Sequence, residues 1–171
     1  MRAQSKVDHR LYVIAAAAAV GLLSSAAPTI AATSTATFTV QVTVVATCTI
    51  NSASTLNFGS QGVFTANVDQ TSTIQVQCTN TTPYTIGLDA GLGSGATVAV
   101  RKMTSGGATV NYTLYSDSGR TTVWGTTIGT NTVAATGNGA AQSYTVYGRI
   151  PAQTTPAPGS YADTVTVTVT Y

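Results

Sequence analysis

The sequence contains no glutamate, and its single histidine, His9, lies close to the N-terminus. A serine or cysteine nucleophile normally needs a histidine base, and zinc sites usually contain histidine or unpaired cysteine. Because the first 32 residues have the features of an export signal, His9 would be removed with them. We therefore predict no enzymatic activity and no catalytic, cofactor-binding or metal-binding residues.

Charged residues are also scarce, at 7% of the chain. From residue 33 onward the chain has four basic residues and four acidic ones, so its formal net charge is zero. These residues are Arg101, Lys102, Arg120 and Arg149, and Asp69, Asp89, Asp117 and Asp163. This balance predicts no nucleic-acid partner and no basic surface for anionic lipid. A glycosidase-type carboxylate pair would have to come from these aspartates, but each lies in a turn-like or strand-end context that favours hydrogen bonds to the backbone.

No apolar run is long enough to cross a bilayer comfortably. The run from residue 11 to residue 23 falls short of the about 20 residues that a membrane-spanning helix needs. It follows Arg2, Lys6 and Arg10 and precedes small residues, which is the order of a secretory signal peptide. We expect residues 1–32 to be a signal peptide cleaved near residues 31 and 32, with an uncleaved anchor as the alternative.

Cysteine is limited to Cys48 and Cys78. In an exported chain such a pair predicts a single disulfide, and two free buried thiols are the alternative. The length left after export fits one domain with one core.

What the chain does contain is short alternating segments separated by turn residues, with no helical periodicity after the leader. Strands are expected at 48–50, 56–58, 71–78, 84–88, 98–103, 110–115, 143–147 and 161–171, with one weak strand in the glycine- and threonine-rich stretch 125–139. Many short strands with frequent turn signals predict an all-β fold, namely an immunoglobulin-like Greek-key β-sandwich.

The segment Phe38–Val44 has the clearest alternation. Phe38, Val40, Val42 and Val44 share one face of a strand, and polar residues occupy the other. A half-apolar strand must join a sheet. The residues alone leave open whether that sheet belongs to its own domain or to a neighbouring subunit.

Five local motifs occur in register along the rest of the chain. They are Asn57–Gly59, Arg101–Met103, Asn111–Gly125, Tyr147–Gln153 and Gly159–Val165. In this order they resemble the spore coat protein U domain family, which includes the Csu-type major pilins of archaic chaperone–usher pili. The resemblance covers nearly the whole chain after the leader.

This resemblance implies a sandwich that lacks one strand. In the family, a periplasmic chaperone lends the missing strand, and an outer-membrane usher exchanges it for the N-terminal strand of the next subunit. Residues 33–46 would then be the donor segment and 47–171 the pilin-type domain, with Phe38, Val40, Val42 and Val44 as donor residues. Cys48 and Cys78 would match the family's disulfide, and Val165, Val167, Val169 and Tyr171 would flank the acceptor groove.

The resemblance therefore predicts a stalk subunit of an adhesive pilus, exported through the periplasm to the cell surface. Its partners would be the chaperone, the usher, identical subunits in a head-to-tail polymer and a tip adhesin. The alternative is a secreted spore-coat or surface-matrix protein of the same fold. A carbohydrate-binding module is less favoured, because its sugar platform would need aromatic residues such as Tyr112, Tyr115, Trp124, Tyr144 and Tyr147, and period-two aromatics more often pack a sandwich core.

Overall fold

A computed structural model describes residues 28–171, so most of the expected signal peptide lies outside the described residues. The described part divides into two units, with the boundary between Gln41 and Val42. The second unit carries all eight strands found in residues 28–171, and no helix occurs there. Accordingly, no helix long and apolar enough to cross a membrane is found in the described residues.

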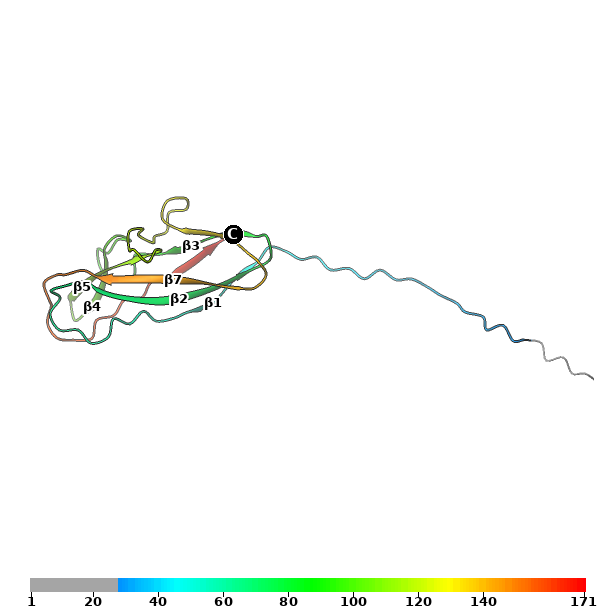
Figure 1. Ribbon diagram of the computed structural model, residues 1–171, viewed down its shortest axis with the longest axis horizontal. Helices are drawn as coiled ribbons and strands as arrows, with labels where there is room; N and C mark the ends of the chain where they lie inside the picture. Colours follow the sequence, from blue (N-terminus) through cyan, green and yellow to red (C-terminus); the bar gives the residue numbers. More distant parts are fainter. Residues whose placement is uncertain (1–27) are drawn as a thin grey trace, which may run out of the picture. The chain divides into compact units, whose positions relative to one another are not determined.

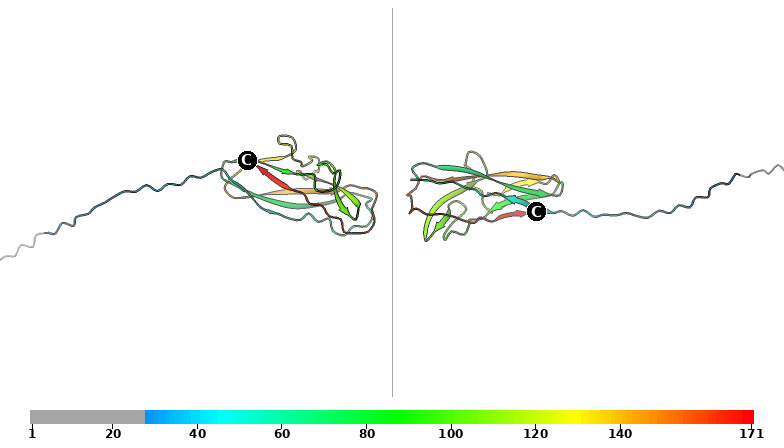
Figure 2. Two further views of the ribbon diagram at one scale, coloured as in Figure 1. Left: turned by 180° about the vertical axis from the view of Figure 1, so that it is seen from behind. Right: turned by 90° about the horizontal axis from the view of Figure 1, so that it is seen from below.

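The strands form two antiparallel sheets that pack as a sandwich (Figure 1). Their bounds are β1 Cys48–Ala53, β2 Val68–Cys78, β3 Pro83–Leu88, β4 Arg101–Ser105, β5 Ala108–Tyr115, β6 Val133–Thr136, β7 Ala141–Ile150 and β8 Val167–Thr170. The larger sheet has the order β1-β2-β7-β5-β4, and the smaller has the order β6-β3-β8. Both layers can be followed from behind and from below in Figure 2.

Side-chain alternation explains why these segments become strands that face a common core. Along β5, Val110, Tyr112 and Leu114 are buried, and the residues between them are partly exposed. The buried residues of β2, β3 and β7 repeat this period of two, so that the two inner faces meet around Trp124. The predicted all-β, immunoglobulin-like sandwich is confirmed.

Three of the expected strands, 56–58, 98–103 and 161–171, differ clearly from what the structure has. Residues 56–58 form a loop, because Asn57 Oδ1 accepts a hydrogen bond from the amide of Gly59, whose φ of 72° turns the chain. Leu56 and Phe58 still reach the core, where they pack over Gly148; a Cβ at position 148 would come within 2.7 Å of Leu56. The loop therefore replaces a strand without losing its apolar contacts.

The expected C-terminal strand 161–171 is shorter than predicted, with regular pairing only in β8. Upstream, Ala162 makes a single isolated bridge to Thr104. The segment before Arg101 is also not a strand, because Thr97 and Val100 bond to each other's backbone in a turn. The weak strand expected within 125–139 is present as β6.

Each sheet has an edge strand that borders the opening of the sandwich and is hydrogen-bonded on one side only. β1 pairs only with β2, and β8 pairs only with β3. These two edges belong to different sheets, and Cα atoms of β1 and β8 come within 8 Å of each other. A complete sandwich would need a further strand beside these edges, so the fold is an incomplete sandwich.

Candidate functional site: an open groove with an apolar floor

A groove with a cavity volume of about 1230 Å³ opens into the core of the sandwich. One wall is the segment 53–64, which follows β1, and the other is the segment 155–167, which leads into β8. The two walls are joined at their far end, where the amide of Phe64 donates to Thr155 Oγ1 and the amide of Gln153 donates to the Phe64 carbonyl.

The floor of the groove is made of core side chains from both sheets. They are Ile74, Leu88, Met103, Val110, Tyr112, Leu114, Val146 and Ile150. A closed sandwich would cover these residues with the side chains of a further strand. The groove is therefore shaped to receive apolar side chains that approach from a strand lying along its opening.

The β8 wall offers both backbone and side-chain contacts to such a strand. Val165 and Val167 are half-buried and line the groove, while Thr164 and Thr166 are exposed. A strand inserted between two others needs about 9.5 Å between its flanking neighbours. Cα atoms of β1 and β8 come within 8 Å of each other, so the groove is narrow where these two strands meet. The end of β8 lies beside the start of β1 (Figures 1 and 2), whereas Val165, which precedes β8, lines the open part of the groove; these are called its narrow end and its wide end.

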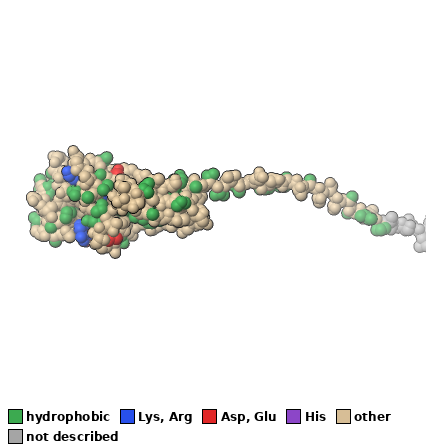
Figure 3. All heavy atoms as spheres, turned by 90° about the horizontal axis from the view of Figure 1, so that it is seen from above, with side chains coloured by type: hydrophobic (Ala, Val, Ile, Leu, Met, Phe, Trp, Pro, Cys, Tyr) green, Lys and Arg blue, Asp and Glu red, His purple; other side chains and the backbone are tan. Residues whose placement is uncertain are grey.

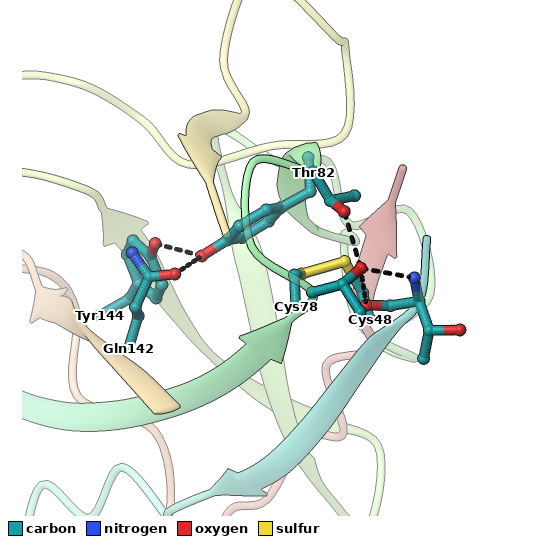
Figure 4. The surroundings of a disulfide bond; sticks show 8 residues. Cys48, Cys78, Thr82, Gln142 and Tyr144 are labelled. Atoms are coloured by element: carbon teal, nitrogen blue, oxygen red, sulfur yellow. Dashed lines mark hydrogen bonds between the residues drawn. A yellow bond between two sulfur atoms is a disulfide. The ribbon is translucent and has the colours of Figure 1, made fainter. Parts of the chain in front are cut away.

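The narrow end is fixed by a disulfide between Cys48 and Cys78, as the sequence predicted (Figure 4). This bond joins the first residue of β1 to the last residue of β2. Beside it, the amide of Thr47 donates to Thr79 Oγ1, which also hydrogen-bonds Thr82 Oγ1. The chain is therefore firmly held at the point where it enters the sandwich.

The wide end contains a polar network around a buried arginine. Arg101 has no exposed surface, and its guanidinium donates to the carbonyls of Leu88, Asp89, Val98 and Trp124. Nearby, the Tyr112 hydroxyl donates to Asp163 Oδ2 over 2.7 Å, while Asp163 Oδ1 accepts from the amide of Leu92. These bonds tie the end of β3 to the chain leading into β8.

The network shifts the pKa values of its members in directions set by burial and charge. Burial raises the pKa of Tyr112 well above its ordinary value, and the hydrogen bond to Asp163 adds to this shift. Burial lowers the pKa of Arg101, although the neighbouring acidic groups oppose the change. At Asp89, burial acts to raise the pKa, but hydrogen bonds from Thr166 and Gly91 outweigh it and lower the value.

The expected donor residues lie in a segment without regular secondary structure, since residues 28–47 contain no strand. Phe38, Val40, Val42 and Val44 are 77–88% exposed. Four large apolar side chains exposed in one alternating row are unusual for a soluble chain and call for a covering surface. Their role as donors remains a prediction.

The four residues expected to flank the groove fall into two groups. Val165 and Val167 line it, whereas Val169 packs against the core nearer the narrow end. Tyr171 is 60% exposed and lines a separate shallow hollow on the smaller sheet.

Sequence reasoning missed the loop wall 53–64 and the polar pair Tyr112–Asp163. The loop's apolar residues Leu56, Phe58 and Phe64 were a usable signal, because a polar surface loop would not need them. Nothing in the local sequence marks Asp163 as a partner of Tyr112, which lies 51 residues away. In residues 28–171, no group of three or more histidine, cysteine or acidic residues is arranged to hold a metal ion.

Comparisons with known proteins agree with this geometry. The Spore Coat Protein U domain matches residues 34–168. "Protein U" of Myxococcus xanthus is 36% identical over 173 aligned residues, which cover 92% of this chain and 96% of that protein.

Among solved structures, a chain of the CsuC–CsuE chaperone–tip adhesion subunit pre-assembly complex, from archaic chaperone–usher Csu pili of Acinetobacter baumannii, matches with a TM-score of 0.57 and 25% identity. The match covers 75% of the present chain and 41% of that one.

Proposed function

Because the chain belongs to the spore coat protein U domain family, we propose that it is a structural subunit of a surface polymer, specifically the stalk subunit, or major pilin, of an adhesive chaperone–usher pilus. The subunits polymerise by donor-strand exchange, in which residues 38–44 of one copy fill the groove of the next. The protein performs no catalysis in this role.

The observation that carries this proposal is the match between the groove and the exposed segment. The groove opens onto the core along the inward-facing residues Val165 and Val167. The segment Phe38–Val44 presents four apolar side chains at the same period of two. Burying four such side chains at about 1.5–3 kcal/mol each gives roughly 6–12 kcal/mol as an upper estimate. Main-chain bonds to the free edge of β8 add to this.

Because donor and groove are different surfaces, the contact is head-to-tail and yields an open filament instead of a closed dimer. An exposed apolar groove in a newly exported subunit also needs a temporary cover. A periplasmic chaperone supplies that cover, and an outer-membrane usher exchanges it for the next subunit. The likeness to a chain from a chaperone–tip subunit complex supports this assignment of partners, including a tip adhesin at the end of the filament.

A second candidate is a coat or surface-matrix protein of the same fold. The full-length match to Protein U of Myxococcus xanthus favours it, as does the family's name. Donor-strand exchange serves both roles, and only the form of the deposited polymer separates them. Thin filaments on the cell surface in electron micrographs favour the pilus, and an amorphous layer favours the coat.

Electrophoresis of the exported protein tests polymerisation itself. The full chain is compared with a variant that lacks residues 33–45, each with and without boiling in detergent. We expect heat-sensitive ladders from the full chain and none from the deletion. A deletion variant that forms the same ladders would refute donor-strand exchange through this segment.

A further inference from the structure

We propose that neighbouring sandwiches in the polymer make a second contact besides the donor strand. In this contact, exposed apolar side chains at the wide end of the receiving copy's groove occupy a hollow at the disulfide end of the copy that donates the strand. This inference rests on the proposed function and names surfaces outside the groove. The wide-end knob is defined by Val63 and Leu92. The hollow lies between Ile128 and Tyr171, with Pro83 and Ala134 among its lining residues.

The length of chain between donor and sandwich brings the two surfaces together. Only residues 45–47 separate Val44, the last donor residue, from Cys48, which the disulfide fixes to β2. An extended chain spans at most about 14 Å from Val44 to Cys48. The sandwich that owns a donor strand is therefore held against the sandwich that receives it.

Strand direction decides which ends meet. All the pairings within the described sandwich are antiparallel, and antiparallel ladders are slightly more stable than parallel ones. A donor antiparallel to β8 places its C-terminal residue, Val44, near the N-terminal side of β8, beside Val165. That is the wide end of the groove, so the incoming copy's disulfide end faces the receiving copy's wide end.

The wide end carries two isolated, strongly exposed apolar side chains. Val63 is 74% exposed on the rim of the groove, and Leu92 is 77% exposed. Leu92 is held in place through its amide, which donates to Asp163 Oδ1 over 2.8 Å. Covering these two side chains with apolar surface of the next copy would remove exposed apolar area from water.

The disulfide end carries the complementary surface. The hollow lies on β3, β6 and the end of β8, with Ile128 59% and Tyr171 60% exposed. None of its lining side chains is charged, and Pro83, Ile128, Ala134 and Ala135 give it an apolar part that an aliphatic side chain can cover. On the face drawn in Figure 3, charged side chains are few and apolar ones lie among uncharged neighbours.

Paired cysteine substitutions test the contact in the full-length, exported protein. Leu92→Cys/Ile128→Cys and Val63→Cys/Ile128→Cys are compared with Thr145→Cys/Ile128→Cys, whose first position is exposed in the middle of β7, where it pairs with Thr73. We expect at least one of the first two pairs to give ladders that survive boiling and disappear on reduction, whereas the control pair gives only heat-sensitive ladders.

Substituting the hollow alone provides a second readout that needs no new disulfide. Ile128→Asp should keep the heat-sensitive ladder but lower the temperature at which it dissociates by several degrees. The adjacent exposed substitution Thr127→Asp should leave that temperature unchanged.

The outcomes separate this contact from the proposed function. The contact is overturned, and donor-strand exchange stays intact, under two joint results. Neither cysteine pair gives cross-links although heat-sensitive ladders form, and Ile128→Asp leaves the dissociation temperature unchanged. Cross-linked dimers from Ile128→Cys alone also overturn it, because the hollow would then face itself. Loss of all ladders in the unsubstituted protein refutes polymerisation, and the contact with it.

Discussion

Arg101 shows how a single residue organises the wide end of the groove. Its side chain is fully buried, and its hydrogen-bond partners are backbone carbonyls instead of a carboxylate. Four carbonyls accept hydrogen bonds from its guanidinium. Those carbonyls belong to Leu88 at the end of β3, to the connection 89–100 between β3 and β4, and to Trp124. The guanidinium is the only side chain with enough fixed donors to satisfy all four at once.

Replacing Arg101 with Met should therefore destabilise the sandwich severely. The carbonyls would remain buried without donors, and we expect a loss of about 3 kcal/mol or more in the free energy of unfolding. Urea unfolding of the exported protein measures it. Lys102→Met is the matched control, because this neighbouring side chain makes one hydrogen bond to the carbonyl of Ser94 and should change stability by less than about 1 kcal/mol. Equal losses for the two variants would contradict the role given to Arg101.

Tyr112 gives the fold a dependence on alkaline pH. Burial, then the bond to Asp163, raises its pKa in the folded state, whereas an unfolded tyrosine titrates near pH 10. The stability from its neutral form is fully present below pH 10 and is lost as pH rises above it, since only the unfolded chain releases the proton. In Tyr112→Phe, the thermal midpoint should therefore fall less steeply between about pH 9 and 11 than in the unsubstituted protein. Some decline should remain, because burial also raises the pKa of Tyr144. An identical decline in the variant would show that Tyr112 is not responsible.

At the level of elements, period-two alternation identified the strands that bury one complete face. It worked for β2, β3, β5 and β7 because each turns a row of large apolar residues inward. It failed at residues 56–58, where a side-chain-to-backbone bond and a glycine with positive φ override the pattern. It overestimated the last strand, because Val165 faces the groove without a neighbouring strand on its open edge.

The donor assignment says that the apolar face of residues 38–44 fills the groove. Substitutions on the two opposite faces of this segment test it. Val42→Asp places a carboxylate in the apolar groove and should abolish ladder formation. Thr43→Asp carries the same charge on the opposite face and should leave the ladders largely intact. Detergent electrophoresis of unheated samples reads both variants. If both polymerise equally, the apolar face of this segment is not what fills the groove.

The disulfide holds β1, a strand with only one hydrogen-bonded neighbour, at the entry to the sandwich. It closes a loop with a sequence separation of 30, for which chain entropy predicts a contribution of roughly 3–4 kcal/mol. The double substitution of Cys48 and Cys78 by Ser should lower the yield of exported subunit and its thermal midpoint. Unchanged values for both would mean that β2 alone is sufficient to hold β1.

At the scale of the whole molecule, the family and the sandwich could be inferred from residues in sequence order, but the groove could not. Its walls come from segments about 100 residues apart, and its width depends on how closely β1 and β8 approach. The same holds for the pair Tyr112–Asp163, which only the folded topology brings together. Alternation predicts which side chains turn inward, and long-range packing determines where the inward face stays uncovered.

The balance of charge across the molecule leads to a final expectation about assembly. Residues 28–171 carry four basic and four acidic side chains, so two copies neither attract nor repel each other strongly at long range. If apolar burial in the groove drives polymerisation, the rate of ladder formation should change less than about twofold between roughly 20 and 500 mM sodium chloride. Time courses of ladder formation from chaperone-bound subunits measure this. A tenfold fall in rate at high salt would instead indicate a charge-steered encounter, for which the charged cluster of Asp69, Arg120 and Arg149 would be the first surface to substitute.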